Sequence, residues 1–174
     1  MSSTSDAASM KDLVFSDVAA ELATTRRVLE RVPEEHFGWK PHEKSFALGS
    51  LASHLANLPL WGIAILSADE LDLSVPPSIP GAASTSAELL ARWDDHAATL
   101  TRAIDALDEG ALGRTWTMRR GDHVMISGPR LKVIRGMCLS HMIHHRGQLG
   151  VYLRLLNVPV PSVYGPTADE AASF

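Results

Sequence analysis

Apolar residues recur at helical spacing in four segments of the chain. These segments span about residues 12–31, 48–68, 85–107 and 127–157. In each, apolar side chains return every three or four positions, which places them on one face of an α-helix. Four long helices joined by loops predict an all-α fold, an antiparallel four-helix bundle with at least one long crossover. Ligand sites in such bundles form inside, from side chains on facing helices.

Local signals mark the ends and the shape of these helices. Pro59 lies inside the second segment and should kink that helix, since proline removes one backbone donor. Thr85 or Ser86 caps the third segment, with Glu88 placed as in a capping box. The fourth segment begins with Ser-Gly-Pro at residues 127–129, where proline suits the first helical turn.

The remaining residues predict a small hairpin, irregular connections and a tail. Residues 115–118 and 123–126 flank Arg-Arg-Gly-Asp, which resembles a short hairpin before the last helix. Residues 73–84 hold too many prolines and serines for a regular element, and the prolines after Asn157 require an extended strap. We expect residues 1–10 to form a flexible N-terminal tail and residues 11–174 to form a single domain.

Composition limits the class of protein. The 174 residues are 45% apolar and 21% charged, which is enough apolar material for one globular core. A formal net charge of −4 provides no basic field for phosphates, so we expect no nucleic-acid partner. No signal-peptide pattern is present, and the longest apolar run, residues 55–66, is too short to span a membrane. These features predict a cytoplasmic protein without a membrane partner.

Eight histidines are the unusual feature of the composition, and their helical positions differ. At ~100° per residue, His141 and His145 fall within the apolar stripe of the last helix, whereas His144 falls on its flank. His54 lies in the middle of the apolar stripe of the second helix. His96 also lies on an inner face, where a hydrogen-bonded core histidine is the more common role. The remaining three lie in predicted loops: His36, His42 and His123.

Two inward histidines one turn apart, with a third on another helix, predict a metal site. Neutral imidazoles offer lone pairs to zinc, nickel, copper or iron, and the i, i+4 spacing lets His141 and His145 share one ion. With His54 as a third ligand, a coordination position stays open for water or substrate, as in catalytic sites. Each histidine alone is also compatible with core packing, and periodicity does not show which helices are neighbours.

Other polar positions near these histidines are weaker candidates. Asn57 and Gln148 each follow a candidate ligand by three residues and can either support its second ring nitrogen or make ordinary inter-helix hydrogen bonds. Cys138 is too far along the helix from His145 to share its ion, so we interpret it as a buried small apolar residue. As the only cysteine it indicates a reducing compartment, excludes a cysteine-rich zinc site and leaves any reacting thiol to come from outside. No carboxylate lies on the inner faces beside the histidines, which argues against a glutamate-assisted peptidase.

The outer face of the last helix is rich in small residues. Gly136, Ser140, Gly147 and Gly150 leave room for close approach by another segment. A dimer contact and packing of the C-terminal strap are both compatible with this pattern.

Two stretches of the sequence resemble the DinB/YfiT-like superfamily. The first is SLASHLANLPLW around His54, and the second is HMIHHRGQLGVYLRLLNVPVPSVYGPTADE from His141 to Glu170. The most specific part is HxxxHRGQ followed by the proline strap and YGPTADE, and the resemblance covers about residues 11–170. It implies an up-down-down-up four-helix bundle that holds a divalent ion through three histidines, at the positions of His54, His141 and His145.

The resemblance also implies a metal-dependent and commonly dimeric protein, with zinc or nickel as the metal and iron or manganese as alternatives. Some members are S-transferases or isomerases that use a low-molecular-weight thiol such as bacillithiol or mycothiol, and others are associated only with stress or DNA damage. We therefore expect a homodimeric metal-dependent enzyme of the thiol S-transferase or isomerase type, acting on a small-molecule substrate. The alternatives are a metal-dependent hydrolase that uses activated water and a non-catalytic metal-binding stress-response protein.

Overall fold

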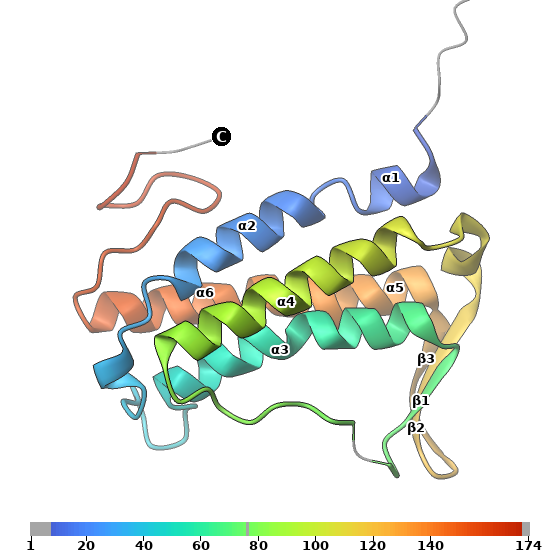
Figure 1. The fold of residues 1–174 in the computed structure, drawn as a ribbon, viewed down its shortest axis with the longest axis horizontal. Helices are drawn as coiled ribbons and strands as arrows, with labels where there is room; N and C mark the ends of the chain where they lie inside the picture. The colour runs from blue at the N-terminus through green and yellow to red at the C-terminus, as the bar shows by residue number, and fades with distance from the viewer. Residues whose placement is uncertain (1–7, 76, 172–174) are drawn as a thin grey trace, which may run out of the picture.

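The computed structural model describes residues 8–75 and 77–171, and Figure 1 shows the arrangement of its elements. The α-helices are α1 (Met10–Val14), α2 (Val18–Leu29), α3 (Leu48–Ser67), α4 (Ser86–Asp105), α5 (Arg130–Ile134) and α6 (His141–Leu155). A π-helical segment, η3 (Arg135–Ser140), joins α5 to α6, and 3₁₀ turns form η1 (Glu34–His36) and η2 (Glu109–Gly113). The strands are β1 (Glu70–Asp72), β2 (Thr115–Arg120) and β3 (His123–Pro129).

Four helical rods surround one core, as the four apolar segments predict. The α3 helix packs against α4 and α6, and α2 packs against the same two helices (Figure 1). The first and last predicted helices are segmented, because α1 is separated from α2 by a break and α5 reaches α6 through η3. Large apolar side chains, among them Leu51, Trp93 and Leu100, are fully buried between the rods.

The prediction of an all-α fold is wrong, because the structure also contains a three-stranded mixed sheet. The predicted hairpin is present as antiparallel β2 and β3, and β1 adds to β2 in parallel. The β1 strand has three residues, and its partner strand lies far along the chain. So short a segment has no hydrophobic periodicity from which the sequence could predict a strand. Ion pairs from Arg119 of β2 to Glu70 and Asp72 hold β1 in place. The sheet lies at one end of the bundle (Figure 1).

The α3 helix lies at the centre of the core. An 18-residue window of this helix has a mean hydropathy of 1.2, so the helix is long and apolar enough to cross a membrane. However, 67% of that window is buried inside the protein. Pro59 lies within α3 and lacks the N–H that would bond the Leu55 carbonyl. The next carbonyl, that of Ala56, accepts a hydrogen bond from His96 Nδ1 at 2.9 Å. His96 is therefore a half-buried, hydrogen-bonded residue that connects α4 to α3.

The last helix begins later, and is less regular, than the sequence suggests. Residues 127–129 continue β3, so the predicted first helical turn is strand and α5 begins at Arg130. The η3 segment then contributes a wider turn, and one extra residue in a helical turn rotates everything after it by ~100°. The buried apolar residues of α6 are Met142, Leu149 and Leu153.

The two ends of the chain can be compared with the predicted N-terminal tail and the predicted C-terminal strap. Residues 1–7 of the predicted tail lie outside the described residues, and α1 already begins at Met10 after a capping Ser9. Residues 158–171 form the strap and contain no helix or strand. Val160 of the strap lies 3.8 Å from the place where a Cβ on Gly150 would stand, so the strap covers part of the small-residue face of α6. The homodimer stays a prediction.

Candidate metal centre

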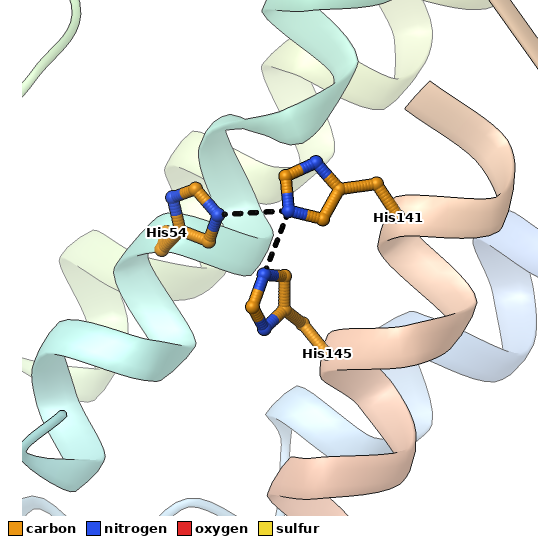
Figure 2. Close-up of side chains that lie close together, drawn as sticks. All are labelled: His54, His141 and His145. Atoms are coloured by element: carbon orange, nitrogen blue, oxygen red, sulfur yellow. Dashed lines mark hydrogen bonds between the residues drawn. The ribbon is translucent and has the colours of Figure 1, made fainter. Parts of the chain in front are cut away.

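Three histidines from two helices point toward one another between α3 and α6 (Figure 2). The Nε2 atom of His141 lies 3.5 Å from Nε2 of His54 and 2.8 Å from Nε2 of His145. One ring nitrogen from each residue lies within 4.8 Å of the other two. The structure therefore brings together the three residues that the sequence selected on separate helices.

A close contact between Gly62 of α3 and the Cys138 side chain helps to explain how imidazoles on α3 and α6 come within reach. A Cβ on Gly62 of α3 would stand 2.9 Å from Cys138 Sγ and 2.7 Å from Leu100 Cδ1, so only glycine leaves room there. His54 lies about two turns before Gly62, and His141 lies about one turn after Cys138. The contact at Gly62 therefore sets the separation of the two helices that the histidines bridge.

The spacing of the nitrogen atoms fits a divalent ion. Two nitrogen ligands each ~2.0–2.1 Å from a tetrahedral ion lie ~3.3–3.4 Å apart. The 3.5 Å between His54 and His141 agrees with that value. The 2.8 Å between His141 and His145 is a hydrogen bond between two rings, and it has to open by ~0.5 Å to admit an ion. The three nitrogen atoms all lie within 4.8 Å of one another, so the cluster can hold a metal ion after side-chain adjustment.

Protonation also suits metal binding. Burial, followed by the proximity of His145 and His141, lowers the pKa of His54 to about 4. Burial likewise lowers the pKa of His145, although its hydrogen bond to Gln148 opposes the shift. Both rings are therefore neutral near pH 7, and the neutral imidazole is the form that binds a metal.

Comparison with known proteins gives the family. The sequence profile described as the DinB family matches residues 1–173. The chain belongs to the DinB family. A relative from Bacillus subtilis, the uncharacterized protein YrdA, is 25% identical over 169 residues, which cover 88% of this chain and 87% of the relative.

Solved structures of DinB-like proteins share the fold. A DinB-like protein, YjoA, from Bacillus subtilis superposes with a TM-score of 0.67 at 19% identity, covering 86% of this chain and 96% of that one. A DinB-like protein from Bacillus cereus gives a TM-score of 0.64 at 18% identity, covering 87% and 95%. A putative DinB-family member from Exiguobacterium sibiricum gives 0.60 at 20% identity, covering 91% and 95%.

Of the two supporting residues that the sequence suggested, Gln148 contacts a histidine and Asn57 does not. Gln148 Oε1 accepts a hydrogen bond from Nδ1 of His145 at 2.7 Å. That bond keeps the ring proton on Nδ1 and leaves the Nε2 lone pair facing the cluster. Asn57 instead donates Nδ2 to the Pro80 carbonyl at 2.8 Å, which fastens the loop before α4 onto α3.

The other histidines lie outside the cluster. The ring centroid of His144 is 4.9 Å from that of His145, but its side chain is exposed and contributes no nitrogen to the group of three. This placement agrees with the flank position that helical spacing gives it. The three histidines predicted to lie in loops are exposed, but only His42 lies in a loop, since His36 ends η1 and His123 begins β3.

Cys138 lies beside α3 with its side chain fully buried. Burial raises the pKa of its thiol to about 12, so the thiol stays protonated near neutral pH. A protonated, inaccessible thiol is a poor nucleophile and a poor metal ligand. The sequence-based interpretation of Cys138 as a small apolar residue therefore holds.

One residue beside the cluster escaped the sequence analysis. Phe46 lies directly before the N-cap of α3, and its ring stacks on His54 with a centroid distance of 6.1 Å and an interplanar angle of 28°. Helical periodicity gives no information about residues outside a helix, so the apolar stripe could not place it. The available signal was its position, an aromatic residue immediately ahead of the helix that carries His54.

Proposed function

We propose that this DinB-family protein binds one divalent ion, zinc or nickel, through Nε2 of His54, His141 and His145. It would act as a metal-dependent enzyme of the thiol S-transferase or isomerase type on a small molecule. The observation that carries the proposal is the convergence of three imidazoles from two helices (Figure 2). Among residues 8–75 and 77–171, no further histidine, cysteine or carboxylate joins that group, which leaves coordination positions for a substrate.

The chemistry would follow from the open positions and from the residues around them. A divalent ion with open coordination lowers the pKa of a bound thiol or water and so provides a nucleophile near neutral pH. Gln148 orients His145 for this role through its 2.7 Å hydrogen bond. Because Cys138 is buried and protonated, the reacting thiol would come from a low-molecular-weight co-substrate rather than from the chain.

Metal content tests the site. We expect the wild-type protein to retain about one equivalent of zinc or nickel after dialysis, and His141→Ala and His145→Ala to lose it, because two ligands rarely suffice. His144→Ala is the matched control on the same helix and should keep its metal. Full metal content in both ligand variants, measured by elemental analysis, would show that the ion binds elsewhere.

Thiol binding tests the reaction class. Cobalt-loaded protein titrated with bacillithiol, mycothiol and glutathione should develop an intense sulfur-to-cobalt absorption band with at least one of them. The His145→Ala protein should give no such band under the same conditions. A spectrum unchanged by all three thiols would argue against S-transfer, and it would favour activated water and hydrolysis at the same centre.

A further inference from the structure

We infer that Phe46 is the surface on which the metal centre holds an apolar, planar part of its substrate. The inference rests on the proposed function, since it concerns what binds beside the three histidines. It assigns Phe46 the role of a specificity-determining residue. The substrate class is then a small molecule in which a metal-binding sulfur or oxygen is attached to a group about the size of a phenyl ring.

The position of the ring is the first reason. Phe46 stacks nearly parallel to the ring of His54, a proposed ligand, at 6.1 Å and 28°. Even so, 55% of Phe46 is exposed. A molecule with one atom at the histidine cluster has its adjoining atoms within reach of this ring. Aromatic rings interact best with other planar groups at centroid separations of ~4.5–7 Å, so the exposed part of Phe46 can take a second planar partner beside His54.

The rigidity of the ring's attachment is the second reason. The Phe46 carbonyl accepts a hydrogen bond at 3.3 Å from the hydroxyl of Tyr152 on α6. Tyr152 in turn packs edge-on against Trp39 at 5.7 Å. The Trp39 carbonyl accepts the Leu48 N–H of α3 at 2.8 Å. The main chain at Phe46 is thereby held between both helices that carry the histidines, and a surface on a fixed backbone binds with a smaller loss of entropy.

A purely structural explanation accounts for less of what is seen. The residue before a helix N-cap is often apolar because it packs against the fourth helical residue, here Leu51 of α3. That general pattern accounts for an apolar side chain at position 46. It does not explain why more than half of a phenylalanine remains exposed beside a proposed metal ligand, where a smaller aliphatic residue would cover Leu51 at a lower cost in exposed apolar area.

Paired ligands on cobalt-loaded protein test the inference. One pair is acetohydroxamate and benzohydroxamate, which bind metals through oxygen, and the other is ethanethiol and benzyl mercaptan. In wild type we expect the phenyl-bearing member of each pair to bind ~3- to 10-fold more tightly. Phe46→Ala should bring that ratio close to one, and Phe46→Leu should give an intermediate ratio.

Two controls separate this effect from loss of the site or of the fold. Val124→Ala removes a side chain of similar exposure, 53%, from the distant β3 strand, and it should leave both ratios unchanged. Cobalt affinity, titrated first, should agree within about twofold among all the variants, since Phe46 donates no atom to the metal.

The outcomes distinguish the inference from the proposed function. A phenyl preference that persists in Phe46→Ala, or that is missing in wild type, would overturn the inference and leave the metal centre intact. Discrimination among hydroxamates without thiol binding would support Phe46 and contradict the thiol chemistry. A wild-type protein that takes up no cobalt would refute the metal centre and the inference with it.

Discussion

His145 and Arg146 are adjacent in α6 and both buried, but they point ~100° apart around that helix and meet different chemical groups. His145 faces α3, where it meets two more imidazoles. Arg146 faces α2, where Nη1 pairs with Glu21 Oε2 at 2.7 Å. The α6 helix therefore contributes to two polar sites, one a cluster of three imidazoles and the other an ion pair.

The Arg146 site pairs a buried cation with a buried anion. Tyr164 of the strap accepts a hydrogen bond from Arg146 Nη2 at 2.9 Å and donates one to Glu21 Oε1 at 2.7 Å. Thr25 accepts another from Arg146 Nη1 at 3.2 Å. Each charge has an opposite charge, and the strap is fastened to α2 and α6 by the same contacts.

The histidine site has no such pairing of opposite charges. Three groups of one kind face each other with their ring nitrogens, and a single proton shared between His141 and His145 is the strongest contact among them. Buried polar groups in proteins normally have complementary partners, and departures from that rule concentrate at functional sites. The comparison shows that burial of a polar side chain does not by itself indicate a functional site. Convergence of three imidazoles without an opposite charge does indicate one.

The largest effect that tests this comparison is on stability. Arg146→Met should lower the free energy of unfolding by about 3 kcal/mol or more, because it leaves the Glu21 carboxylate buried without its partner. The double variant Glu21→Gln, Arg146→Met should recover part of the loss, since no lone charge is left. Urea unfolding of the metal-free proteins measures both.

His145→Ala is the neighbouring control in the same metal-free experiment. It removes a neutral ring that has no opposite charge, so we expect a clearly smaller loss than for Arg146→Met. If the two single variants lost equal stability, the distinction between a structural site and a binding site on α6 would fail.

The next effect is on metal affinity. Gln148→Leu should weaken zinc binding by ~10- to 100-fold, because His145 loses the acceptor that fixes its Nδ1 proton. Gln148→Glu retains an acceptor and should keep affinity near that of wild type. Competition with a chromophoric chelator gives both values, and equal loss in the two variants would show that Gln148 acts through packing instead.

The histidine cluster was open to prediction because its geometry is local. His141 and His145 lie within one regular helix, so their common direction does not depend on η3 or on anything before it. His54 falls on its stripe for the same reason in α3. What spacing could not supply was the adjacency of α3 and α6, which the Gly62 contact establishes between residues far apart in the chain.

The features that escaped prediction all depend on distant partners or on irregular backbone. β1 exists because β2 pairs with it, and three residues alone carry no pattern. η3 places an extra residue in a helix that otherwise looks continuous in sequence. The partner of Arg146 could not be predicted either, because Glu21 lies 125 positions earlier in the chain.

The smallest effect is on the pH dependence of stability. The pKa of His54 is about 4 in the folded protein and about 6.5 in the unfolded chain, so the unfolded chain takes up a proton first as pH falls. The folded state therefore loses stability between about pH 6.5 and pH 4, and above that window His54 contributes no slope. His54→Gln should flatten this part of the curve in metal-free protein, while the exposed His42→Gln should leave it as in wild type. Comparing the variants at each pH cancels the carboxylates, which titrate in all three proteins. Identical slopes for wild type and His54→Gln would mean that His54 is as easily protonated in the folded protein as in the unfolded chain, and the cluster would then lack the neutral rings that distinguish it from the ion pair at Arg146.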